Sequence, residues 1–112
     1  MATTAAEWES KRDEQTKQVE DALKKAGFEQ VDSYRYNSAS IRLRVIDKRF
    51  EGLPISKRDD LIEPHIDKLP EATRLDIITL LTLAPSEVQD PRKSLSHGLL
   101  NLEFEQPSRT ML

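Results

Sequence analysis

The chain has 112 residues, enough for one domain with a single modest hydrophobic core. Its 17 Lys and Arg residues are nearly balanced by 20 Asp and Glu residues, and the sequence pI is ≈ 5.4. A general nucleic-acid binder usually carries a basic excess, so this composition argues against that class while leaving room for a local basic patch.

Cysteine is absent from the chain. Disulfides, thiolate catalysis and cysteine-ligated zinc or iron–sulfur centres within this chain are therefore excluded. No stretch has the apolar length of a signal-peptide core or of a membrane span. We therefore expect a cytoplasmic protein.

The first predicted element is a helix over about residues 5–26, a stretch without Gly or Pro. Gly27 stands where a helix commonly ends. Val19, Leu23 and Ala26 share one helical face, so the last turns are expected to pack and the start, residues 1–12, to be exposed. Trp8 is expected to be either a partly buried anchor or a contact for a partner.

Residues 28–46 predict a β-hairpin, with strands at 31–36 and 40–46 and a turn at 37–39. A two-residue loop at Ser38 and Ala39 would set the register. The expected pairs are Tyr36 with Ile41 and Tyr34 with Leu43 on a buried face, and Arg35 with Arg42 and Ser33 with Arg44 on an exposed face. A slip of one residue would reverse every face.

A second helix is expected to follow Gly52 and Pro54, because Ser56 and Asp59 have the spacing of a short capping box. Its apolar face would comprise Leu61, Ile62, His65, Ile66 and Leu69. Pro64 lies within this pattern and is expected to kink or split the helix.

Residues 75–83 form the most apolar run and predict a buried strand. Further on, Leu100, Leu102 and Phe104 alternate, so residues 99–106 are expected to form either an edge strand or a segment that docks on a partner. We therefore divide the chain into a domain at residues 1–90 and a C-terminal part at 91–112, with a linker, this segment and a tail.

The predicted order is helix, β-hairpin, helix and strand, with an optional C-terminal strand. Such a chain buries its apolar faces as an α+β domain, with helices on one face of a small mixed three-stranded sheet.

This order, with the turn Phe50-Glu51-Gly52, resembles the BolA-like proteins, whose fold is similar to the class II KH domain. The matching helix opens at Lys57-Arg58-Asp59-Asp60, and the matching last strand ends at Ala84-Pro85-Ser86-Glu87. The resemblance covers roughly residues 19–87.

The resemblance implies a partner, because BolA-like proteins bind monothiol glutaredoxins and share an iron–sulfur cluster held partly by a His of the last strand. Asp76 stands at that position here, and a carboxylate is a poor substitute for imidazole on such iron. Arg58 is retained at the helix opening, whereas Asp59 and Asp60 replace the family's His and Arg. We therefore expect no metal ligands and no cofactor.

Candidate binding residues are Arg35, Arg42, Arg44, Arg58 and Asp76. The first three would form a basic patch suited to phosphate or carboxylate, or else a solvated face paired with nearby acids. A KH-type grip on RNA would also require a Gly-x-x-Gly loop, which the sequence lacks. His65 and His97 have no second ligand at metal spacing and are interpreted as structural or surface residues.

These observations predict a non-enzymatic interaction module that binds a protein partner. One alternative is a nucleic-acid or anion-binding module that uses the same arginines. Another is a small enzyme subunit whose active site is completed by a second chain.

Overall fold

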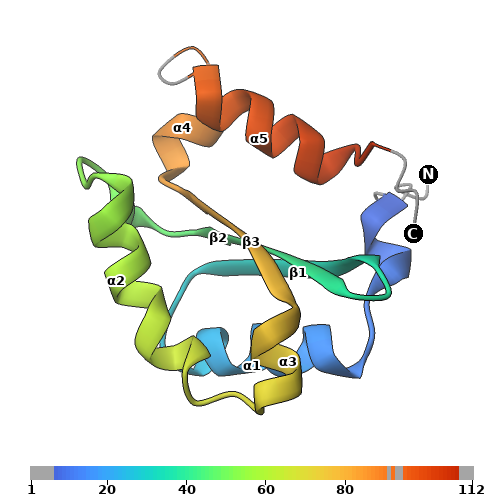
Figure 1. Cartoon of the computed structure of the whole chain (residues 1–112). Helices are drawn as coiled ribbons and strands as arrows, with labels where there is room; N and C mark the ends of the chain where they lie inside the picture. The colour runs from blue at the N-terminus through green and yellow to red at the C-terminus, as the bar shows by residue number, and fades with distance from the viewer. Residues whose placement is uncertain (1–6, 91, 93–94, 109–112) are drawn as a thin grey trace, which may run out of the picture.

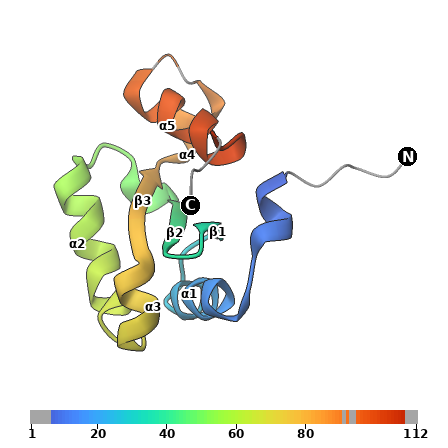
Figure 2. The same cartoon turned by 45° about the vertical axis from the view of Figure 1, so that its right-hand side comes forward.

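Three strands form one sheet at the centre of the molecule, and helices lie on both sides of it (Figures 1 and 2). The computed structural model describes residues 7–90, 92 and 95–108. The elements in chain order are η1 (Glu7–Lys11), α1 (Glu14–Lys25), β1 (Gln30–Asn37), β2 (Ser40–Ile46), η2 (Lys48–Phe50), α2 (Ile55–Ile66), α3 (Glu71–Asp76), β3 (Ile77–Leu83), α4 (Pro85–Gln89) and α5 (Leu95–Glu105).

The sheet has the order β1-β2-β3. β1 pairs with β2 in antiparallel orientation, and β2 pairs with β3 in parallel orientation, with α2 and α3 forming the crossover. The predicted α+β class and mixed three-stranded sheet are therefore confirmed.

The first helix is interrupted, whereas the sequence predicted one continuous helix. Asp13 caps α1: its carboxylate accepts the Thr16 N–H at 2.9 Å, and its own N–H donates to the Thr16 hydroxyl at 2.8 Å. This reciprocal cap begins a new helix and separates η1 from α1. Gly27 follows α1 with φ +95, as the expected helix end requires. Residues 5 and 6 of the predicted helix lie outside the described residues.

The hairpin register differs from the expected one by a single residue. Asn37 pairs with Ser40 as predicted for the two-residue loop, but Arg35 rather than Tyr36 pairs with Ile41. A bulge between Arg35 and Asn37 accommodates Tyr36 as the extra residue, and such a bulge reverses the faces of the strand that precedes it. Tyr34 therefore pairs with Arg42, and Ser33 with Leu43.

One face of the sheet carries the main core, under α1 and α2. Its buried residues are Val19, Leu23, Phe28, Val31, Leu43, Val45, Phe50, Ile62 and Ala84. This helical layer and the inward side chains of β2 agree with the alternation in the sequence. Glu20 is also buried here, and its carboxylate accepts the Ser33 N–H at 2.9 Å at the edge of β1.

The opposite face was expected to be exposed, and this expectation is wrong. It carries a second core formed by Trp8, Tyr34, Leu81, Leu83 and Phe104. Trp8 is only 6% exposed, which confirms its interpretation as an anchor within the chain. The cover comes from Trp8 of η1 and Phe104 of α5, and α5 lies on the side opposite α1 in Figure 2.

The C-terminal segment forms the helix α5, so the edge-strand alternative for residues 99–106 is wrong. Leu95, Leu99 and Leu102 recur at i, i+4 and i+7, and this helical spacing prevails over the alternation of Leu100, Leu102 and Phe104. Phe104 places α5 in the second core.

Two local boundaries also differ from expectation. α2 begins at Ile55 after Pro54 without a side-chain cap, so the capping box at Ser56 and Asp59 is wrong. Pro64 lies in the last turn, where the helix continues to Ile66. β3 begins at Ile77, because residues 71–76 form α3.

Replacing Phe104 with Ala should destabilise the domain by about 3 to 5 kcal/mol, because it removes a buried ring from the second core. The matched control is Leu102→Ala, an exposed leucine of the same helix, which should change stability by no more than about 0.5 kcal/mol. Urea unfolding at low protein concentration measures both. Equal effects would show that α5 does not pack on the sheet.

Candidate interaction surface

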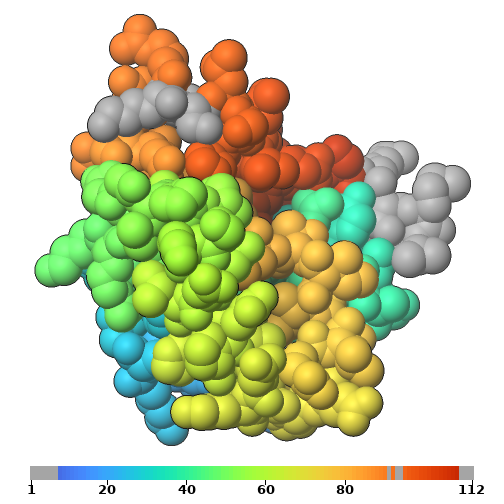
Figure 3. All heavy atoms as spheres, turned by 60° about the vertical axis from the view of Figure 1, so that its left-hand side comes forward, coloured from blue at the N-terminus to red at the C-terminus, as the bar shows by residue number. Residues whose placement is uncertain are grey.

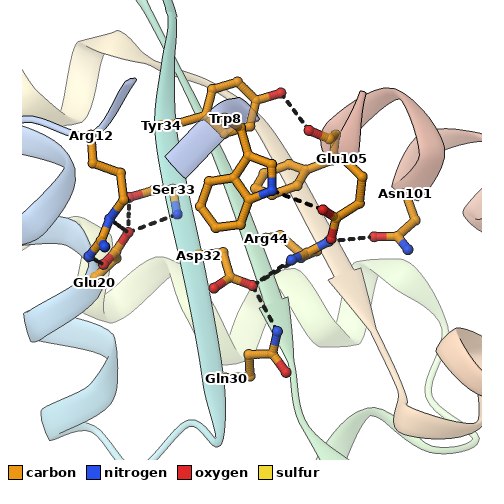
Figure 4. A network of polar contacts seen from close by, with 11 residues as sticks. Trp8, Arg12, Glu20, Gln30, Asp32, Ser33, Tyr34, Arg44, Asn101 and Glu105 are labelled. Atoms are coloured by element: carbon orange, nitrogen blue, oxygen red, sulfur yellow. Dashed lines mark hydrogen bonds and ion pairs between the residues drawn. The ribbon is translucent and has the colours of Figure 1, made fainter. Parts of the chain in front are cut away.

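Arg44 of β2 connects β1, α5 and, through Glu105, η1 (Figure 4). Its side chain is only 4% exposed. Nη2 donates to Asp32 at 2.7 Å, Nη1 donates to Asn101 at 2.9 Å, and Nη1 also pairs with the Glu105 carboxylate. Glu105 in turn accepts the Trp8 indole N–H at 2.9 Å. A buried guanidinium requires such partners, so Arg44 holds η1 and α5 to the sheet.

Arg42 makes a second attachment to α5. Its Nη1 donates to Glu103 at 2.7 Å and to the Tyr34 hydroxyl at 3.1 Å. The Tyr34 hydroxyl donates to the Phe104 carbonyl at 3.0 Å. Arg42 and Arg44 therefore lie together on the sheet face that α5 covers.

Arg35 lies on the opposite face, because the bulge at Tyr36 reverses the faces of β1. Its Nε donates to Asp13 at 2.9 Å and its Nη1 to Asp76 at 2.7 Å. These bonds tie the start of α1 to the end of α3. Burial opposes ionisation of Asp13, but the Thr16 N–H and Arg35 outweigh it and lower the pKa of this carboxyl.

Arg58 is separate from the other candidates and buried within α2. Its guanidinium binds Glu87 at 2.6 and 3.1 Å and donates to the carbonyls of Leu53 and Thr82. This bidentate pair joins α2 to α4.

The five predicted site residues are thus distributed over three places. The expected arrangement of Arg35, Arg42 and Arg44 on one exposed face is wrong, whereas the structure brings Arg35 and Asp76 together. Each of the four guanidiniums is bound to at least one carboxylate. A role of these residues in binding a partner or an anion stays a prediction.

The two histidines lie apart. His65 packs edge-on against the Phe28 ring, and Nδ1 of His97 lies 3.3 Å from the Glu87 carboxylate. Among the described residues, no three His, Asp or Glu side chains are grouped so that they could hold a metal ion.

The outer side of α5 is apolar, and the side that faces the sheet is mixed. Leu95, Leu99 and Leu102 are 73%, 67% and 54% exposed, and we call them the leucine stripe. Asn101 and Glu105 point inward to Arg44. A helix that packs on a sheet normally buries its apolar face, so α5 has the reverse arrangement.

A groove of about 210 Å³ runs between α5 and β3. Its lining residues are Arg42, Thr79, Leu80, Leu81, Leu100, Glu103 and Phe104. Ile78, next to Thr79, is 67% exposed where β3 has an irregularity in its register. In Figure 3, atoms of α3 and β3 reach the surface below α5. The stripe and the groove are thus two separate apolar features of α5, one on its outer side and one where it meets β3.

Leu95 and Leu99 were not predicted as site residues, because Leu95 lies in the expected linker and Leu99 lies outside the alternation of Leu100, Leu102 and Phe104. The signal was present in the spacing of Leu95, Leu99 and Leu102, which fits a helix and nothing else. The pairing of Arg42 with Glu103 joins residues 61 positions apart and has no local signal.

No protein family, curated protein or solved structure matches the chain. In the part of the chain that the structure describes, no helix combines the length and the apolar character needed to cross a membrane. The fold and surface thus define a small α+β domain with an outward-facing apolar helix.

The carboxyl of Glu103 should titrate at unusually low pH. Hydrogen bonds from the Ser108 hydroxyl, from Arg42 and from the Ser108 N–H lower its pKa from 4.5 to about 2. A depressed pKa stabilises the folded state above the unfolded value, and this stabilisation is lost as the pH falls from 4.5 towards about 2. An NMR titration of the side-chain carboxyl carbon measures the midpoint.

The control for this titration is Ser108→Ala, which removes the first of these donors and should move the midpoint upward towards 4.5. A midpoint near 4.5 in the unaltered protein would contradict the contacts of Glu103.

Proposed function

We propose that this chain is a non-enzymatic interaction module that binds a protein partner through the outer side of α5. The observation that carries the proposal is the leucine stripe, in which three leucines are exposed although α5 packs on the sheet. Contiguous apolar surface of this kind marks interaction sites, because its exposure to water is unfavourable. A partner that covers the stripe would remove this cost.

A second apolar surface of α5, the groove, supports a binding role for this helix. It lies directly beside Leu100, between α5 and β3, and most of its lining side chains are apolar. Arg42 and Glu103 stand among them as a bound pair. A partner could therefore contact an apolar surface with a few polar groups, the usual composition of a binding site.

We also propose a distant relationship to the BolA-like proteins. The element order and the turn at Phe50-Glu51-Gly52, with φ +74 at Gly52, support it. The resemblance covers residues 19–87, so it does not include η1 and α5, which cover the second face of the sheet.

A cytoplasmic location stays a prediction from the sequence.

The partner class implied by that relationship is a monothiol glutaredoxin. The residues present do not fit a shared iron–sulfur cluster, because Asp76 offers an oxygen in place of imidazole and is bound to Arg35 at 2.7 Å. Any binding of a glutaredoxin would therefore use surface contacts alone.

The nucleic-acid alternative has no observation in its favour. Arg35, Arg42 and Arg44 are each bound to carboxylates, and they do not share one face. Phosphate binding would require these ion pairs to break. The carboxylates would then lose their cationic partners, which costs free energy.

A photoreactive benzoylphenylalanine in place of Leu99 should form crosslinks to a bound protein in cells that express the full chain. The same residue in place of Lys57, an exposed position on α2, is the matched control and should give several-fold fewer crosslinks. Adding Leu95→Lys and Leu102→Lys should remove the Leu99 crosslinks. Equal yields at positions 99 and 57 would overturn the proposal.

Reconstitution with iron, sulfide, glutathione and a monothiol glutaredoxin tests the family chemistry separately. The visible spectrum should equal that of the glutaredoxin treated alone, because Asp76 replaces the expected His ligand. A new charge-transfer band that depends on this chain would refute the assignment of Asp76 as a non-ligand.

A further inference from the structure

The outer edge of the sheet is open at Leu80 of β3, which is an edge strand in the order β1-β2-β3 (Figure 2). The next residues show which way the backbone groups point. The Leu83 carbonyl accepts the Asp47 N–H at 3.1 Å on the side of β2. The Thr82 carbonyl instead accepts Nη1 of Arg58 at 3.1 Å, on the outer side. Backbone groups of successive residues alternate between the two sides, so the N–H and C=O of Leu80 also lie on the outer side. Among the described residues, no hydrogen-bond partner from a side chain or another element reaches them.

Two other edge positions of the sheet are blocked by charged side chains. On the edge of β1, the Glu20 carboxylate accepts the Ser33 N–H at 2.9 Å. Further along the edge of β3, Arg58 binds the Thr82 carbonyl. Proteins block their edges in this way because an open edge pairs with another strand. Leu80 lies on a stretch of edge that these side chains leave open.

The groove between α5 and β3 borders this open stretch. Leu80 belongs to its lining, although the Leu80 side chain packs against the main core. The part of Leu80 that borders the groove is therefore its backbone. Leu81 and Leu100 provide apolar surface on the two walls, and Leu100 is 52% exposed. The two charged residues of the lining neutralise each other as an ion pair.

We propose that an extended segment of a partner protein binds along the outer edge of β3 as a fourth strand, with apolar side chains at alternate positions in the groove. The open N–H and C=O of Leu80 define this occupant, because an extended segment offers unpaired backbone groups to such an edge. A helix uses its own backbone groups internally and cannot do so. Every second side chain of the segment would then contact Leu81 and Leu100. The surface is separate from the leucine stripe, so the inference goes beyond the proposed function.

The open stretch is short, which determines how tightly the segment binds. Arg58 blocks one end, and the register irregularity of β3 lies before Thr79 at the other end. The added strand therefore forms only a few hydrogen bonds. A short isolated peptide should bind with a dissociation constant in the roughly millimolar range, because it must also be ordered on binding.

Amide hydrogen exchange of the full chain, followed by NMR, tests whether the edge is open. The Leu80 amide should exchange at least about tenfold faster than the Leu81 amide, which faces β2. The probe is a blocked heptapeptide of alternating Val and Thr with a Lys at each end. At saturating peptide, exchange of the Leu80 amide should slow by about tenfold or more. Equal exchange at positions 80 and 81 in the free chain, or no slowing with peptide, would overturn the inference.

Two N-methylated versions of this peptide test the strand pairing, one methylated at every Val and the other at every Thr. In an extended peptide, the N–H groups of the Val residues point to one side and those of the Thr residues to the other, so only one set faces β3. Methylation of that set should weaken binding by more than about tenfold, because the Leu80 carbonyl loses its donor. Methylation of the other set should leave binding unchanged. Equal binding of the two versions would contradict a fourth strand.

A charge in the groove tests where the side chains of the peptide lie. Leu100→Glu should weaken peptide binding several-fold, because the peptide would cover the new carboxylate. The matched control is Ile55→Glu, another exposed apolar position, which should bind the peptide as the unaltered chain does. Near-ultraviolet circular dichroism of Trp8 verifies that both variants are folded. Loss of binding in Leu99→Glu, with none in Leu100→Glu, would place the peptide on the leucine stripe and overturn the assignment.

The remaining outcomes separate this inference from the proposed function and from self-association. Crosslinks from position 99 without any protection of the Leu80 amide overturn the edge site and leave the proposed function. Peptide protection without crosslinks above the Lys57 control supports the edge site and overturns the leucine stripe as the binding surface. Protection of the Leu80 amide that grows with protein concentration in the absence of peptide identifies a second copy of this chain as the occupant, which overturns the assignment to a separate partner.

Discussion

The buried guanidinium of Arg44 is the interaction on which the arrangement of this molecule depends. A charge on the sheet face is unfavourable beneath a helix unless acceptors accompany it, and here Asp32, Asn101 and Glu105 provide them. Glu105 also binds Trp8, so one carboxylate joins both covering segments. Asn101 and Glu105 consequently lie on the inner side of α5, and the leucines of the stripe lie on its outer side. The apolar surface of α5 is thus a result of how the charge on β2 is neutralised.

The sequence predicted the parts of the fold that depend on local patterns. The alternation of Ile41, Leu43 and Val45 defines the inner face of β2 correctly, because successive side chains of a strand always point to opposite sides. The Gly27 helix end and the two-residue hairpin loop are local as well, and both were predicted. Each depends on residues adjacent in the chain.

The predictions that were wrong concern features that depend on contacts between distant segments of the chain. The bulge at Tyr36 has no local signal, and it moved Tyr34 and Arg35 to the faces opposite those expected. Arg42 and Arg44 were predicted to be exposed, because no helix was predicted in the C-terminal segment that covers them. Their partners Glu103 and Glu105 follow 61 residues later in the chain. The candidate site therefore moved from the arginines to the leucines of α5.

The bond between Trp8 and Glu105 spans 97 positions and has a consequence for the newly made chain. Every buried residue of the main core lies between positions 19 and 84, so the main core is complete in sequence once residue 84 has been synthesised. The second core must wait for Phe104. Until α5 packs, the Tyr34, Leu81 and Leu83 side chains lack the cover that Phe104 provides, so a partly folded chain exposes an apolar sheet face. A chaperone that shields apolar surface would bind the chain at this stage, before α5 packs on the sheet.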